Sequence, residues 1–169
     1  ALSGQYQRHL DRVLDYNTRG HDNALYYLQV PAYERYNLGR SELRIPVVPP
    51  HEVLHKELQQ TLHLQAQLAT SLAAGQWPPC YNDNSVVQRH APALVHPVAL
   101  YVDGVYYSNK DGMVVFVVYN LLTEERTLVA ALRRCQLCRC GCRGGWCTIH
   151  VVWRFLGWSF SALADGRFP

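Results

Sequence analysis

The residues with the clearest chemical potential are the cysteines. Five of the six fall within thirteen residues, as Cys135, Cys138, Cys140, Cys142 and Cys147. A structural zinc ion needs four soft ligands that converge at about 2.3 Å, and the glycines between these cysteines let the backbone fold around an ion. The sequence therefore predicts a structural zinc site whose ligands are Cys138, Cys140, Cys142 and Cys147, with Cys135 as a substitute ligand.

Two other uses of these cysteines stay open at this point. Disulfides would need an oxidising compartment, and several of the pairs are so close in sequence that bridging them would strain the backbone. Free thiols are the second alternative. The spacing also departs from the paired C-x2-C knuckles of common zinc modules, so it indicates a metal without naming a class of zinc finger.

Four arginines surround the cysteine run: Arg133, Arg134, Arg139 and Arg143. Guanidinium groups placed this way can contact nucleic-acid phosphates, which would make binding sensitive to salt. They can equally be solvated and offset the charge of nearby thiolates. The net charge of +3, from 14 Arg and 2 Lys against 13 acidic residues, permits an anionic partner but does not demand one.

A second constellation is the run His51-Glu52-Val53-Leu54-His55, which matches H-E-x-x-H. On a helix the two histidines share a face and could bind zinc, while Glu52 could act as a general base in peptide hydrolysis. The extended form of the motif is absent, because Leu58 and Thr61 stand where its Gly and His would be. The alternative is a set of solvated polar residues in the first turn of an amphipathic helix.

A third candidate is Asp103, in the run Leu-Tyr-Val-Asp-Gly. A carboxylate at the end of a strand can hold a divalent metal for phosphoryl transfer if other carboxylates join it. Asp-Gly is also a common turn dipeptide, and spacing alone favours the turn.

The elements that position these residues differ between the two halves of the sequence. Apolar residues at helical spacing predict a short helix over 5–16, and a leucine stripe after Pro49 and Pro50 predicts one long helix that ends at Gly75. The tyrosine- and proline-rich stretch 21–50 is expected to be irregular, and 80–97 to be a loop.

After Pro97, three runs rich in β-branched and aromatic residues predict antiparallel strands. A helix then follows from about Trp146 to Ala164 and ends at Asp165-Gly166. The strand runs are Val98–Val102, Met113–Tyr119 and Thr127–Leu132. The expected fold class is α/β (α+β): a helical N-terminal half, then a three-stranded antiparallel sheet with a zinc loop and a C-terminal helix. The expected domains are 1–75, a linker at 76–97, and 98–169.

The stretch 146–164 is the one segment with some character of a membrane span. His150 and Arg154 lie in its middle, and a charge near the centre of a bilayer costs at least about 2.5 kcal/mol. An amphipathic or buried helix is therefore expected, with membrane association as the secondary interpretation.

The stretch 97–123, PVALYVDGVYYSNKDGMVVFVVYNLLT, resembles the beginning of the catalytic domain of CACTA-like DDE transposases. The segment LCRCGCRGGWC, with the Trp-rich helix and ALADGRFP, also resembles a multicopy, uncharacterised family of dinoflagellate proteins related to mobile elements. This resemblance covers about residues 76 to 169. It implies the start of an RNase H-like fold, in which Asp103 would be the first catalytic carboxylate and the cysteines an insertion between the third strand and the first helix.

The later strands and the other carboxylates of such a nuclease are expected to be missing from this sequence. The resemblance therefore implies a transposase-derived, zinc-containing, nucleic-acid-associated protein that is catalytically incomplete, with an intracellular, nuclear location favoured. One alternative is a non-catalytic accessory subunit of a larger assembly, docking on protein partners in an organelle or at a membrane. A second alternative is the H-E-x-x-H zinc metalloprotease.

Overall fold

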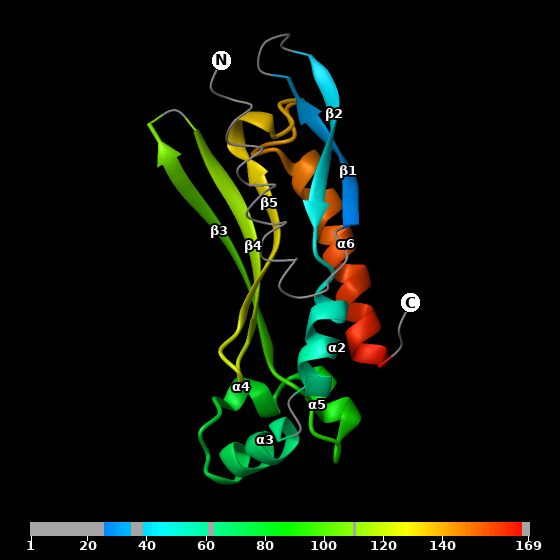
Figure 1. Cartoon of the computed structure of the whole chain (residues 1–169), viewed down its shortest axis with the longest axis vertical. Coiled ribbons are helices and arrows are strands. Elements are labelled where there is room, and N and C mark those ends of the chain that lie inside the picture. The colour runs from blue at the N-terminus through cyan, green and yellow to red at the C-terminus, as the bar shows by residue number, and fades with distance from the viewer. Residues whose placement is uncertain (1–25, 35–38, 61–62, 110, 167–169) are drawn as a thin grey trace.

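The computed structural model describes residues 26–34, 39–60, 63–109 and 111–166. Its centre is a five-stranded antiparallel sheet with strand order β1-β2-β5-β4-β3 (Figure 1). The strands are β1 (Tyr26–Tyr33), β2 (Arg40–Val47), β3 (Val98–Ser108), β4 (Asp111–Asn120) and β5 (Arg126–Arg133). The expectation of a mixed α+β fold is confirmed, whereas the expected count of three strands is wrong.

The three strands predicted after Pro97 form as a meander of antiparallel neighbours, β3, β4 and β5. Their β-branched and aromatic residues suit a pleated surface, and Phe116 at the middle of β4 pairs with Ala130. β3 extends six residues further than the predicted Val98–Val102, because Asp103 and Gly104 continue the strand opposite Val115 and Val114 instead of turning.

The two additional strands come from the stretch that was expected to be irregular. β1 and β2 pair along their whole length, from Tyr26 opposite Val47 to Tyr33 opposite Arg40. Pro31 is tolerated because β1 is an edge strand of the described sheet, where a missing N–H costs little. β2 joins the rest of the sheet where Val47 pairs with Ala130. The expected helical N-terminal half is therefore wrong for residues 26–47, and the helix predicted over 5–16 lies outside the described residues.

The helical segments between β2 and β3 gather at one end of the long sheet (Figure 1). Where one helix was predicted, the structure has α2 (Pro50–Gln60) and α3 (Leu64–Ala73), and residues 61–62 between them are outside the described part. Two short helices, α4 (Pro79–Asn82) and α5 (Ser85–His90), replace the expected loop. The Asn84 side chain caps α5 by accepting a hydrogen bond from the backbone N–H of Val86 at 2.9 Å.

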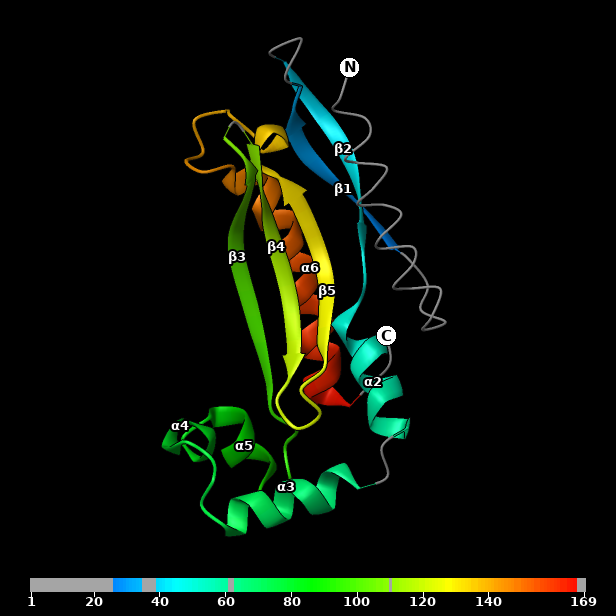
Figure 2. The same ribbon diagram turned by 60° about the vertical axis from the view of Figure 1, so that its left-hand side comes forward.

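The C-terminal helix α6 (Trp146–Asp165) runs along one face of the sheet, as Figure 2 shows, and confirms the predicted helix. Its Val152 and Leu156 are fully buried in a core that includes Phe116 and Val129. Gly166 has a left-handed conformation (φ 61°) and ends the helix as the Asp-Gly signal predicted. Within the described residues, no helix is both long enough and apolar enough to span a membrane.

Candidate metal centre

Four cysteines come together in the connection between β5 and α6, at the end of the sheet opposite α3 and α5. The sulfur atoms of Cys138, Cys140, Cys142 and Cys147 all lie within 4.8 Å of one another. The sulfurs of Cys140 and Cys147 are 3.5 Å apart. Four thiolates arranged tetrahedrally around zinc would stand about 3.8 Å apart, given zinc–sulfur bonds of about 2.3 Å. This group can therefore hold a metal ion with little movement, and it contains the four ligands that the sequence predicted.

Cys135, the predicted substitute ligand, is not in this group. It lies in the short 3-10 helix η1 (Arg134–Gln136), which directly follows β5. All six cysteines of the chain are free thiols in the structure, with Cys80 exposed on the remote helix α4. The arrangement therefore favours the metal over the disulfide alternative.

The cysteine loop is fixed to the fold by contacts that involve no sulfur atom. The backbone N–H of Cys138 donates to Thr148 Oγ1 at 2.9 Å, and the same hydroxyl donates to the carbonyl of Pro31 on β1. Leu137, next to Cys138, forms a β-bridge with Ala32. One buried threonine of α6 thus joins the first candidate ligand to strand β1 through atoms that would not bind the metal.

Gly145 completes this anchor at the start of α6. Its φ is 79°, and a Cβ added there would lie 2.5 Å from Cβ of Leu137. Both the left-handed backbone and the close approach of Leu137 require glycine. The Gly144-Gly145 pair thus lets the chain turn sharply from the cysteine loop into the helix that carries Cys147.

The four thiols share negative charge unequally. Hydrogen bonds from Cys138, Cys142 and Cys147 lower the pKa of Cys140 to about 6. Hydrogen bonds to Cys140 and Cys142 raise the pKa of Cys147 to about 12, and the hydrogen bond with Cys140 raises the pKa of Cys138. At neutral pH Cys140 is therefore the thiolate, beside the protonated thiols of Cys138 and Cys147. A bound divalent cation would displace the remaining protons, as thiolate ligation requires.

A buried carboxylate that sequence reasoning missed supports the other side of the loop. Asp111, at the start of β4, is only 7% exposed. One of its oxygens accepts hydrogen bonds from the Tyr107 hydroxyl and from Nη2 of Arg133, each at 2.7 Å. The other accepts from the backbone N–H groups of Gly112 at 2.9 Å and Cys135 at 3.2 Å. Asp111 thus links β3, β4 and β5 to η1.

These contacts also set the ionisation of the pair. Burial alone would raise the pKa of Asp111, but the hydrogen bonds from Tyr107, Cys135 and Arg133 outweigh it and hold the pKa well below its ordinary value of 3.8. Burial would likewise lower the pKa of Arg133, and its bonds to Asp111 and Tyr107 raise it. The pair is therefore fully ionised at neutral pH.

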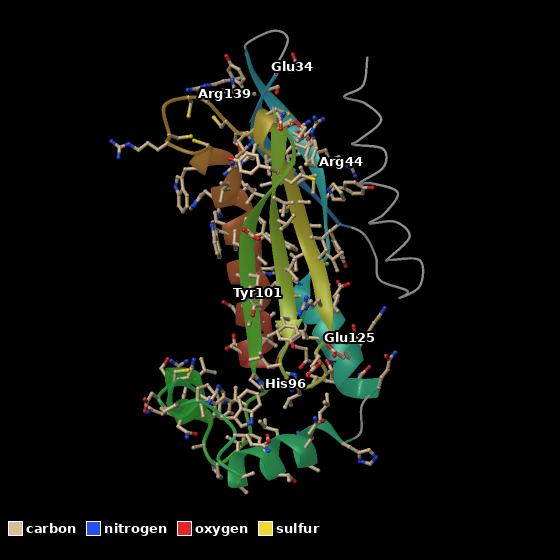
Figure 3. The ribbon with its side chains drawn as sticks, turned by 90° about the vertical axis from the view of Figure 1, so that its left-hand side faces the viewer. Glu34, Arg44, His96, Tyr101, Glu125 and Arg139 are labelled. Atoms are coloured by element: carbon tan, nitrogen blue, oxygen red, sulfur yellow. The ribbon has the colours of Figure 1, made fainter. Side chains whose placement is uncertain are left out.

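The four arginines predicted as nucleic-acid contacts separate into two groups. Arg133 is buried and forms an ion pair with Asp111, which neutralises its charge inside the protein. Arg134, Arg139 and Arg143 are exposed, and no described carboxylate lies within ion-pair distance of them. The guanidinium of Arg134 lies 4.5 Å from the ring centre of Tyr106, and that of Arg139 lies 5.4 Å from the ring centre of Tyr33 (Figure 3 labels Arg139).

The three exposed arginines line a pocket of about 570 Å³ beside the cysteines. Cys138, Cys142 and the glycines of the loop form part of its wall, and Ile149 of α6 and Val114 of β4 form another part. Among the described residues that line the pocket, none is acidic. The loop therefore combines a candidate metal site with a cationic hollow.

Asp103 belongs to no comparable cluster within the described residues. It is exposed within β3, and its Oδ1 accepts a hydrogen bond from the backbone N–H of Gly104 at 2.6 Å. In the described part of the chain, the four cysteines are the only group of three or more His, Cys, Asp or Glu side chains that converges as a metal site. Asp103 lies in the interior of β3, opposite Val115, so it neither ends the strand nor forms a turn.

The H-E-x-x-H residues, at the start of α2, have other partners. His51 is buried, contrary to the expected solvated surface, and its Nδ1 lies 2.9 Å from the Ser159 hydroxyl of α6. Its ring also meets Trp158 edge to face. Glu52 accepts a hydrogen bond from Tyr26 at 2.6 Å, and His55 lies 2.8 Å from the Gln59 amide. His51 thus packs α2 against α6.

In comparisons with known proteins, the chain matches no family model, no curated protein and no solved structure.

Proposed function

We propose that this protein is a zinc-containing, nucleic-acid-associated protein of transposase descent, without complete catalytic machinery in this chain, that acts in the nucleus. The observation that carries the proposal is the convergence of four cysteines beside a pocket lined by three arginines that have no carboxylate partner among the described residues. The resemblance of residues 76–169 to the start of a transposase catalytic domain supplies the context.

Zinc is favoured over other metals by the donor set. Four thiolates in a closed group suit Zn²⁺, whereas Mg²⁺ and Ca²⁺ prefer oxygen ligands. A site with four protein ligands leaves no open position for substrate, so the role of the ion would be structural. It would hold Arg139 and Arg143, which lie between the ligands in sequence, on one face of the loop.

Two features support an association with nucleic acid without catalysis. The exposed arginines Arg134, Arg139 and Arg143 have no described carboxylate partner, which leaves their charges available for phosphates. Asp103 has no second or third carboxylate with which to hold catalytic metal ions within the described residues.

The test of the metal is elemental analysis of the purified protein. We expect about one zinc per chain, and loss of that zinc in a Cys138→Ser, Cys140→Ser double variant. Cys80→Ser is the matched control, because Cys80 is exposed and remote from the group, and it should keep the metal. A wild-type protein purified under reducing conditions that holds no metal would contradict the zinc proposal.

A second candidate function, an accessory subunit of a larger assembly, is favoured by the exposed edge of the sheet. β3 is an edge strand of the described sheet, and five of its large apolar residues are exposed: Tyr101, Val102, Val105, Tyr106 and Tyr107. Its one charged residue is Asp103. An exposed edge with so little charge is suited to pairing with a strand of a partner protein.

Isolation of a defined complex would test this second function. A Val105→Lys variant places a charge on the edge and should abolish the complex. Leu94→Lys places the same charge at an exposed site that precedes β3 and lies outside the sheet, so it should not. A protein that stays monomeric and co-purifies with no stoichiometric partner argues against the assembly role. The metalloprotease alternative gains no support from the positions of His51 and His55, and zinc-dependent peptide cleavage lost in Glu52→Gln would be needed to revive it.

A further inference from the structure

We propose that the arginine-lined pocket binds the backbone phosphate of single-stranded nucleic acid, and that Trp146, in the adjoining first turn of α6, stacks on the adjacent base. This inference rests on the proposed function and names the form of nucleic acid that the site would take. It is carried by the pocket, by the charges that line it and by the exposed aromatic side chain in the first turn of α6.

The pocket suits a phosphate group. Arg134, Arg139 and Arg143 contribute to its lining from different parts of the cysteine segment. Gly141 and Gly144 leave its wall open, since nothing lies within 4 Å of a Cβ built at either. Accessible backbone N–H groups and guanidinium groups are the donors that commonly bind the oxygens of an anion. A volume of about 570 Å³ leaves space for a phosphate with its sugar.

The charge of the pocket remains positive when the metal site is filled. A divalent cation with four thiolates carries a net charge of −2, and the three guanidiniums add +3, which leaves +1. Arg133 contributes nothing to this sum because Asp111 neutralises it. The stacking of Arg134 on Tyr106 and of Arg139 on Tyr33 holds both guanidiniums without neutralising them.

The aromatic side chain points to a single strand. Trp146 is 53% exposed and begins α6, directly after Gly145 and one turn before Ile149, both of which line the pocket. Its ring centre lies 5.7 Å from that of His150, which supports the indole from one side. Bases stack on exposed aromatic rings only when they are unpaired and can turn outward, so a duplex could use the arginines but not the tryptophan.

Fluorescence anisotropy with a labelled 20-nucleotide oligo-dT and a 20-base-pair duplex tests the inference. We expect the single strand to bind more tightly, with an affinity that falls about 20-fold between 50 and 200 mM salt if three phosphate contacts are made. Arg139→Gln, Arg143→Gln should reduce this salt effect to about 3-fold. Trp146→Ala should weaken single-strand binding by about 5- to 150-fold and leave duplex binding unchanged.

Two controls separate the site from the general surface charge. Arg126→Gln removes an exposed arginine near the far end of β5, and Tyr101→Ala removes an exposed aromatic ring on β3. Both should bind the single strand as the wild type does. Equal or tighter binding of the duplex, or no effect of Trp146→Ala, would overturn the inference and leave the proposed function standing. Failure to bind either nucleic acid at 50 mM salt would overturn both.

Discussion

Replacement of Asp111 by Asn should be among the most damaging single changes outside the apolar core. The side chains of Asp111 and Arg133 are 6% and 9% exposed, and their charged atoms are 2.7 Å apart. Asparagine keeps the shape and an acceptor for Gly112 and Cys135, but it leaves the guanidinium buried without a counter-charge. Removing one partner of a buried pair costs about 3–5 kcal/mol. For a chain of this size, that lowers the melting temperature by about 6–20 °C.

The same variant should change how stability depends on pH. Because the folded protein holds the pKa of Asp111 below its ordinary value of 3.8, the stabilisation by its charge is complete above the unfolded pKa and is lost as the pH falls through the folded pKa. The difference in unfolding free energy between wild type and Asp111→Asn should therefore be full at pH 7 and smaller at pH 2.5. Chemical denaturation at the two pH values measures it.

Asp103→Asn is the control for both measurements. Asp103 is an exposed aspartate on the neighbouring strand, so its replacement should change stability by less than about 0.5 kcal/mol. A loss below 1 kcal/mol in Asp111→Asn at pH 7, or a loss of the same size at both pH values, would refute the account of Asp111 as a buried, ionised link.

Three further changes test the anchors of α6. Gly145→Ala should lower the free energy of unfolding by more than about 1 kcal/mol, because φ is positive and the new Cβ would contact Leu137. Gly144 has a similar φ but open space around it, so Gly144→Ala should lower the free energy of unfolding by less. Thermal melting of the two variants measures the difference. Thr148→Val should cost about 1–3 kcal/mol, because the N–H of Cys138 loses its acceptor; a variant that melts like the wild type would contradict this role. Burial lowers the pKa of His51 below 6.5, with Glu52 opposing, so the folded state binds this proton more weakly than the unfolded chain. Stability should thus decline as the pH falls below about 6.5, and less steeply in His51→Gln; parallel pH profiles would exclude His51 as the cause.

The parts of the fold that the sequence predicted are those with strong local signals. The strands after Pro97 are β-branched runs, and α6 ends at the predicted Asp165-Gly166 signal. The four cysteines are also close in sequence, so a short loop can bring them together without help from distant residues. Composition and spacing were sufficient for each of these elements.

The strands β1 and β2 could not be predicted because their stability is not local. Pro31 and Pro46 interrupt the alternation that marks a strand, and the pairing is stabilised by the burial of Val30 and Ile45 in a core to which α6 and β5 contribute. His51 was misjudged for the same reason, since its partner Ser159 is 108 residues away. Asp111 carried no motif at all, because its partners are gathered by strand pairing.

The anchors of the cysteine loop explain why its four arginines differ in role. One end of the loop is held at η1 by the hydrogen bond from Cys135 to Asp111. Asp111 also neutralises the charge of Arg133 through their ion pair. The other end is held by Thr148 and by Gly145, whose contacts use backbone and hydroxyl groups. Neither anchor involves the side chains of Arg134, Arg139 or Arg143. Because the fold fixes both ends of the loop without them, these three guanidiniums have no part in anchoring the loop. A metal at the four sulfurs would need to order only the span between the anchors.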